Sequence, residues 1–96
     1  MRLSFHPQVQ KDINSALRYY DAESSTLGDR FFAELTAAFD AVLQNPHRGH
    51  DSDRNTKRFN LPSFPFHFNY RILPGLIRVL VVKHHKRHPR FGLQRR

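Results

Sequence analysis

Two stretches of the chain repeat their apolar residues at the three- and four-residue spacing of an amphipathic helix. The apolar positions of the first are Val9, Ile13, Ala16, Leu17 and Tyr20. Pro7 precedes them at a position where a helix needs no N–H, so we expect a helix over about residues 7–22. The apolar positions of the second are Phe31, Phe32, Leu35, Ala38, Phe39, Val42 and Leu43. They predict a helix over about 27–44, which Asn45-Pro46 ends, and the two helices should form an antiparallel hairpin.

The second half of the chain instead alternates apolar and polar residues with period two. This pattern predicts strands over 57–61, 66–73 and 76–83, with Pro74-Gly75 as the turn between the last two. Residues 1–5 are a plausible first strand, and 46–56, which lack a large apolar residue, should form a surface loop. The expected fold is therefore α+β, in the order β-α-α-β-β-β. A helical hairpin would pack on one face of a small, mostly antiparallel sheet, in a single domain of residues 1–96.

Period two also assigns the two faces of this sheet. The aromatic row Phe66, Phe68 and Tyr70, joined by Phe59 and Leu61, should face the helices. The open face should then carry Arg58, Asn60, His67, Asn69, Arg71, Arg78, Leu80, Val82 and His84. A two-residue turn at 74–75 would pair 73 with 76, 71 with 78, 69 with 80 and 67 with 82.

That register places Arg71 directly opposite Arg78, and opposed like charges destabilise a sheet. An anion could lie between the two guanidinium groups, or both could splay into water, or a longer loop could offset them. Leu80 and Val82 would form an exposed apolar patch on the same face, which calls for a cover. Residues 91–93 of the same chain or another protein could supply it.

The charge of the chain is divided between its halves. Residues 1–45 hold four Lys or Arg and six Asp or Glu, whereas residues 46–96 hold twelve Lys or Arg and two Asp. This favours a scaffold whose second half binds an anionic partner, such as RNA, DNA or an acidic protein segment, over a self-repelling solvated surface. The run 83–91 contains Lys86, Arg87, Arg90 and three histidines, which would suit phosphate contacts and proton transfer or form a solvated basic tail.

Other classes of site lack support in the sequence. The chain has no cysteine, no glycine-rich phosphate loop, and no apolar run as long as a membrane span, so we expect a cytoplasmic protein. His84 and His88 are four residues apart but fall at a strand end with no carboxylate nearby, so we expect neither a metal nor a cofactor.

Several short motifs, in order, resemble the RelE/ParE superfamily of type II toxin–antitoxin toxins, in particular its ParE-like branch of plasmid stabilisation proteins. They cover most of the chain: Tyr19-Tyr20, Leu27-Gly28, Arg30-Phe31, Glu34-Leu35, Asn45-Pro46, Gly49, Arg58, Leu61, Phe64-Pro65-Phe66, Tyr70-Arg71, His84, Lys86-Arg87 and Pro89. The resemblance implies a small basic toxin that inhibits growth and is neutralised by a cognate antitoxin with an acidic segment. The antitoxin contact is expected near Leu80 and Val82, and anionic contacts at Arg71, Arg78, Lys86 and Arg90.

The resemblance leaves two targets open. ParE-like members act on DNA gyrase, whereas RelE-like members cleave mRNA on the ribosome without a metal. Carried over by position, Arg58 and Arg87 match cations of the nuclease site, while Asn60, His67 and Phe91 replace its lysine, arginine and tyrosine. Were the chain a nuclease, Arg58, His67, His84 and Arg87 would form the catalytic set. The incomplete set and the long helical hairpin favour the gyrase-directed type; a non-toxic remnant that only binds antitoxin is a third alternative.

Overall fold

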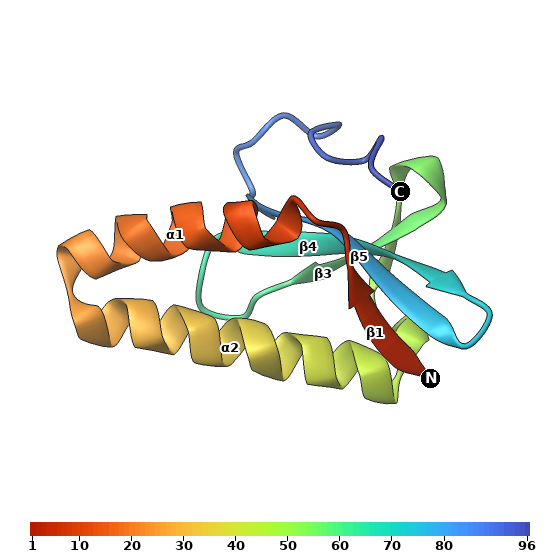
Figure 1. Ribbon diagram of the computed structural model, residues 1–96, viewed down its shortest axis with the longest axis horizontal. Helices are drawn as coiled ribbons and strands as arrows, with labels where there is room; N and C mark the ends of the chain where they lie inside the picture. Colours follow the sequence, from red (N-terminus) through yellow and green to blue (C-terminus); the bar gives the residue numbers. More distant parts are fainter.

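The computed structural model describes all 96 residues as two helices packed on one face of a five-stranded sheet (Figure 1). The elements are β1 (Arg2–Phe5), α1 (Val9–Glu23), α2 (Ser25–Gln44), the 3-10 turn η1 (Pro46–Arg48), β2 (His50–Ser52), the 3-10 turn η2 (Asp53–Asn55), β3 (Thr56–Asn60), β4 (Phe66–Leu73) and β5 (Leu76–His84). The expected α+β order is confirmed. One correction applies to residues 46–56, which contain the short edge strand β2 where we expected only a loop. Neither helix has the length and apolar character needed to cross a membrane.

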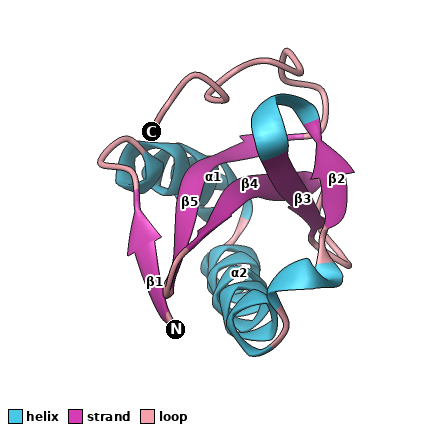
Figure 2. Ribbon diagram, turned by 90° about the vertical axis from the view of Figure 1, so that its right-hand side faces the viewer, coloured by secondary structure: helices cyan, strands magenta, loops and turns pink.

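The strands lie in the order β1-β5-β4-β3-β2 (Figure 2). β1 runs parallel to β5, and every other neighbouring pair is antiparallel. A parallel neighbour needs a crossover, and the helical hairpin supplies it by carrying the chain from β1 across one sheet face. The link between the helices is the single residue Ser24, whose extended backbone ends α1 and whose hydroxyl accepts the Leu27 N–H at 3.0 Å, capping α2.

The main core lies between the hairpin and the sheet. As expected, Phe66, Phe68 and Tyr70 face the helices, and Phe59 and Leu61 join them. Tyr20 and Phe31 of the helices pack edge-on against Phe64 and Phe66, with ring centroids 4.9–6.0 Å apart. Phe32 departs from the expected apolar stripe of α2, because its side chain lies on the outer side and is 47% exposed.

A β-bulge in β5 changes the register of the last two strands. Arg71 opposes Arg78 and Tyr70 opposes Val79 as expected, but Asn69 opposes Val81, which leaves Leu80 as an extra residue. The expected pairs 69–80 and 67–82 are therefore wrong by one residue. Every β5 side chain after the bulge lies on the face opposite to the one that a simple alternation predicts.

Two predicted open-face residues are corrected by this shift. Val82 lies in the helix-side core, and His84 packs its ring against Phe66 on the same side, at 5.2 Å between centroids. Leu80 and Val81, which are consecutive in the sequence, both point to the open face. Lys83 and His85 take the open-face places beyond them.

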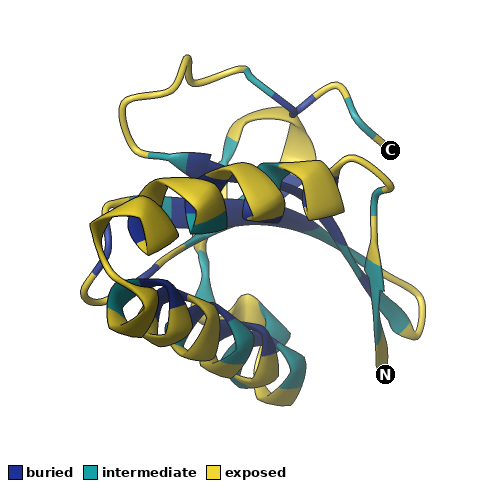
Figure 3. Cartoon of the chain, turned by 60° about the vertical axis from the view of Figure 1, so that its left-hand side comes forward, coloured by how far each residue is buried: buried dark blue, intermediate teal, exposed yellow.

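The C-terminal tail (residues 85–96) covers the open face above the bulge. Leu93 is 1% exposed and packs on Leu80 and Val81, with Phe91 beside them, so the chain itself supplies the expected cover. Gly92 makes this approach possible: its φ is +81°, and a Cβ at this position would meet Val81 Cβ at 2.5 Å. Figure 3 shows one short buried stretch in a tail whose other residues are exposed or intermediate.

Candidate functional site

The opposed pair Arg71 and Arg78 is held by backbone carbonyl groups of the chain. Arg71 donates to the carbonyl oxygens of Arg95 at 3.0 Å, Arg54 at 3.2 Å and Leu93 at 3.4 Å. Arg78 donates to the Ser4 hydroxyl at 2.5 Å, to the carbonyl oxygen of Phe5 at 2.9 Å and to the backbone oxygen of Arg96, the last residue of the sequence, at 3.1 Å. The guanidinium groups therefore do not splay freely into water. These oxygens orient them but leave most of their positive charge uncompensated.

A polar pocket opens between the tail, η2 and the outer ends of β3, β4 and β5. It has a volume of about 280 Å³ and no apolar lining residue; its walls are Asp51, Ser52, Asp53, Arg58, His67, Asn69, Lys83, His85, Arg87 and Pro89. Of the four residues predicted for a nuclease, the pocket brings together Arg58, His67 and Arg87. His84 is not among them, because the bulge turns it toward the helix side.

The centre of the polar pocket is a hydrogen-bonded pair of imidazoles. The Nδ1 atoms of His67 and His85 are 2.9 Å apart, and the rings are inclined by only 17° with centroids 5.1 Å apart, so they meet edge to edge in line. Arg58 donates to Nδ1 of His85 at 3.2 Å. A guanidinium can only donate, so this arrangement requires the single lone pair on Nδ1 of His85 to accept from Arg58 and His67 together, with the His67 proton on its own Nδ1. This assigns the tautomers: His67 is protonated at Nδ1 and His85 at Nε2.

The same arrangement keeps both imidazoles neutral. Burial, followed by the nearby charges of Arg58, His85, Lys83 and His84, lowers the pKa of His67 to about 3. Burial and the Arg58 charge also lower the pKa of His85. A protonated His85 would lose its acceptor atom and face the Arg58 donor. At neutral pH the pair therefore has no proton to give as a general acid, and His67 is a weak base.

Lys83 has a structural role, because its side chain holds the tail in place. The residue is 4% exposed, and its ammonium group donates to the carbonyl oxygens of Pro89 at 2.7 Å, Phe91 at 2.9 Å and His88 at 3.4 Å. Burial, with the charges of Arg58, Arg87 and Arg95, lowers its pKa. His85 and Lys83 were missed by our sequence reasoning, because only the bulge brings them to this face.

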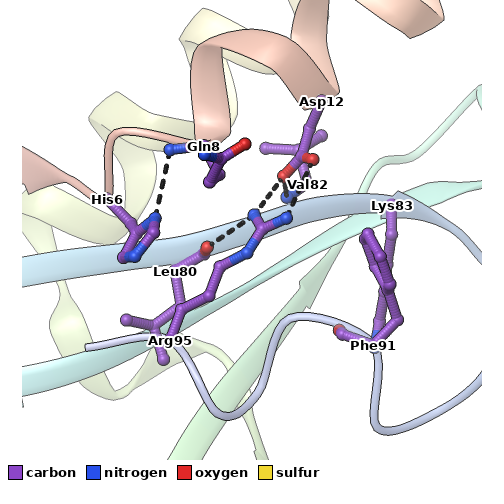
Figure 4. A network of polar contacts seen from close by, with 8 residues as sticks. All are labelled: His6, Gln8, Asp12, Leu80, Val82, Lys83, Phe91 and Arg95. Carbon is purple, nitrogen blue, oxygen red and sulfur yellow. Dashed lines mark hydrogen bonds and ion pairs between the residues drawn. The ribbon is translucent and has the colours of Figure 1, made fainter.

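A larger groove of about 830 Å³ runs between α1, the end of β5 and the tail, and we call it the α1 groove. Its apolar lining residues are Ala16, Tyr19, Tyr20, Phe66, Val82 and Phe91, and its cations are Lys11, Lys83, Arg87 and Arg95, with His84 beside them. Figure 4 shows its inner end, where Asp12 and Arg95 form an ion pair at 2.7 Å. Of the two predicted antitoxin contacts, Val82 lines this groove, but Leu80 is fully buried under the tail and is not accessible.

The remaining predicted contacts lie on the turn that follows β5. Lys86 and Arg90 are exposed there, and their side chains have no hydrogen bond or ion pair within the chain. Arg87 lies over the ring of Phe91, with 3.9 Å between the guanidinium carbon and the ring centroid. No group of three or more His, Asp or Glu side chains converges as a metal site would require.

The family model of the ParE toxin of the type II toxin–antitoxin system parDE matches residues 3–89. This chain belongs to the ParE toxin family. The family belongs to the superfamily that the sequence motifs resemble, and its role is that of the toxin of a type II module, which implies an antitoxin partner.

A solved structure described as the chromosomal ParDE toxin–antitoxin system from P. aeruginosa has the same fold. It superposes on this ParE-family chain with a TM-score of 0.79 over 88% of this chain and 95% of the other, at 15% sequence identity. No curated protein sequence matches the chain.

Proposed function

We propose that this ParE-family toxin stops growth by binding DNA gyrase in the cytoplasm, without cleaving a bond itself, and that an acidic segment of its cognate antitoxin neutralises it. The observation that carries the proposal is the neutral His67–His85 pair. Cleavage of a phosphodiester bond needs a group that gives a proton to the leaving oxygen. Among the groups of the polar pocket, the two imidazoles are neutral and Lys83 is buried and bonded to carbonyl oxygens. Phe91, which stands near the position of the nuclease tyrosine, has no hydroxyl and lines the α1 groove instead.

An mRNA endonuclease is the second candidate. It is favoured by the meeting of Arg58, His67 and Arg87 in one polar pocket, where two arginines could hold a scissile phosphate. Binding of an anion would raise the pKa of His85, which is the one route by which this site could gain an acid. The third candidate is a harmless remnant that binds only its antitoxin.

A labelling experiment separates the three. The chain is expressed from a tightly controlled promoter while incorporation of labelled thymidine and labelled amino acid is followed. The proposal expects early loss of thymidine incorporation with translation intact. It also expects purified toxin to trap gyrase on DNA in a cleavage assay. Early loss of amino-acid incorporation would favour the endonuclease, and unimpaired growth would favour the remnant.

Substitutions in the polar pocket sharpen this comparison. Arg58→Gln and His67→Gln remove groups that a nuclease needs, whereas a gyrase binder should arrest growth as before, provided that both variants fold. His84→Ala is the matched control, because His84 lies on the other face of the sheet. Arrest that disappears with Arg58→Gln and persists with His84→Ala would overturn the binder and support the endonuclease.

The α1 groove is where we place the acidic antitoxin segment. Its aromatic walls, with Lys11 and Arg87, which form no ion pair within the chain, suit a partner that alternates apolar anchors with carboxylates. Tyr19, which is 65% exposed in the groove, should be an anchor, and Phe32, 47% exposed on α2, is the matched control. Tyr19→Ser should weaken antitoxin binding by about tenfold, the loss of one good aromatic contact, and Phe32→Ser should leave it unchanged. Equal effects would move the interface away from this groove.

A further inference from the structure

Four arginines converge on a second open cavity, at the end of the sheet away from the polar pocket. The cavity has a volume of about 450 Å³, and its walls include Arg54, Arg71, Arg78 and Arg96 with Leu73 and Leu93. No acidic residue lines it, and no Asp or Glu follows Asp53 anywhere in the chain. We call it the arginine pocket.

The charge of the arginine pocket is only partly offset within the molecule. Only Lys57 and Arg95, of the sixteen Lys and Arg residues, form an ion pair with an Asp or Glu side chain. Arg71 and Arg78 are half-buried; peptide carbonyl oxygens orient them but carry no charge, and the carboxylate of Arg96, the last residue of the sequence, offsets at most one of the four guanidinium charges. A concave site with several positive charges and walls of low polarisability concentrates its field on the space inside.

Arg54 and Arg96 complete the pocket with free donors. Their side chains form no hydrogen bond or ion pair within the chain, so all of their N–H groups can face a ligand. Arg54 stands in the left-handed region at φ 58°, ψ 39°, and Asn55 follows at φ 57°. This conformation costs an arginine of the order of 1 kcal/mol, and it places η2 at the rim of the pocket. The Arg54 carbonyl then accepts from Arg71.

We propose that the arginine pocket binds a phosphate group of a DNA backbone. Guanidinium groups match the paired oxygens of a phosphate, and four of them with no lysine favour this geometry over a diffuse cloud of charge. A nucleic-acid strand carries further phosphates on either side of the bound one, and the tail holds further cations that could contact them. Figure 1 shows the tail crossing the sheet from the end of β5 toward the segment that holds η2. Lys86, Arg87 and Arg90 belong to the first half of the tail, and Leu93 and Arg96, which line the arginine pocket, belong to its second half.

An acidic peptide would need apolar anchoring sites, and most of these lie in the α1 groove. The arginine pocket offers few of them, so we treat it as a separate site with a different ligand. DNA is chosen as the partner because the proposed target works on DNA, and to that extent this inference rests on the proposed function. The pocket itself is independent of gyrase. Backbone contacts read no base, so duplexes of unrelated sequence should bind equally well.

The test uses the purified full chain and a short fluorescent DNA duplex, without gyrase. Arg54→Gln with Arg96→Gln should weaken binding by about tenfold and lower the slope of log affinity against log salt by roughly 1, the value for one lost phosphate contact. Arg18→Gln with Arg30→Gln is the matched control, because it removes the same charge from the helices. An equal loss in both double variants would mean diffuse attraction and would overturn the pocket, as would no binding by the unmodified chain at low salt.

A second measurement needs no variant. Titration of the duplex into the isotope-labelled chain should shift the side-chain Nε–H signals of Arg71 and Arg78 in NMR spectra. Shifts confined to α1 and α2 would overturn the proposal. Inorganic phosphate that shifts the same signals more strongly than the duplex would show a small-anion site and would overturn the DNA assignment. Because gyrase is absent, a negative result here leaves the proposed toxin target standing, and failure of the gyrase assay leaves the pocket standing.

Discussion

Asp12 and Arg95 are 83 residues apart in sequence, and their side chains form an ion pair at 2.7 Å that closes the free edge of β5. β1 covers this edge only as far as Val79. Beyond it, Asp12 accepts the backbone N–H of Val82 at 3.1 Å, and Arg95 donates to the carbonyl oxygen of Leu80 at 3.1 Å. The pair thus replaces a missing strand with two side chains, and it fastens the tail to α1 (Figure 4).

Breaking this pair should destabilise the protein. Asp12→Ala removes the acceptor of two groups and leaves Arg95 unpaired at a site where its side chain is only 12% exposed. We expect a loss of about 2–4 kcal/mol in the free energy of unfolding by urea, with a similar loss for Arg95→Ala. The double variant should lose less than the sum, by at least about 1 kcal/mol. Strict additivity would show that the two side chains act separately.

The His67–His85 pair predicts that acid weakens the fold. The pKa of His67 is about 3 in the folded chain and about 6.5 when unfolded, so the unfolded chain binds the proton more readily. The contribution of His67 is fully present above about pH 6.5 and is lost as pH falls toward 3, with a total of a few kcal/mol. Urea midpoints measured across this range should fall with pH.

His67→Gln is the control for this titration, because it removes the group while keeping a polar side chain of similar length. The variant should be less stable at pH 7 but should lose less on acidification. A slope as steep as that of the unmodified chain would assign the acid sensitivity to other groups.

Gly92 should resist substitution because the tail approaches the bulge so closely. Gly92→Ala places a Cβ against Val81 at 2.5 Å and strains a residue with φ +81°. We expect a loss of about 1–3 kcal/mol and faster cleavage of the tail by trypsin. Gly75→Ala tests the φ effect alone, since its φ is +66° with open space around it. If both variants lose the same stability, the contact with Val81 carries no cost.

Tyr70 ties the η1 loop to the sheet. Its hydroxyl donates to the Pro46 carbonyl at 2.6 Å and accepts the Gly49 N–H at 3.1 Å. Tyr70→Phe should cost about 1–2 kcal/mol. Gly49→Ala should cost more, because its Cβ would lie 2.6 Å from that hydroxyl oxygen, and Tyr70→Phe should partly rescue it in the double variant. Hydrogen exchange at the Gly49 amide measures the loosening directly; no rescue would place the clash at the Arg58 carbonyl instead.

The helices and the helix-side core could be predicted from the sequence because their signals are local. Ile13 and Phe31 each belong to a row of apolar residues at helical spacing, one row for each helix. Phe66, Phe68 and Tyr70 alternate strictly with polar residues. The nearby residues alone therefore predict which face each of these side chains occupies. The exposed Phe32 is an exception, since a stripe shows that one face is apolar but not how much of it the sheet covers.

The candidate site was harder to predict because it depends on the bulge at Leu80. The run 79–82 is Val-Leu-Val-Val, in which no polar residue marks a change of face. A prediction from simple alternation therefore placed Val82 and His84 on the wrong face of the sheet. It also missed Lys83 and His85 as residues of the site. Packing supplies the missing information, because Leu80 and Val81 together fill the space beneath Leu93. Such a pairing between distant segments has no signature in a single sequence.

The parallel pairing of β1 with β5 also sets the order of events during synthesis. β1 pairs with no other strand, so Phe5 cannot form its strand pairing until Val79 has been synthesised. At about 5–20 residues per second, the ribosome needs roughly 4–15 s to make the intervening segment. Until then the aromatic side of the hairpin lacks part of its sheet, and none of the three cavities is complete, because each is lined by residues after Val79. The α1 groove, in which we place the antitoxin, is lined by residues up to Arg95 and therefore forms only when nearly all of the chain has been made.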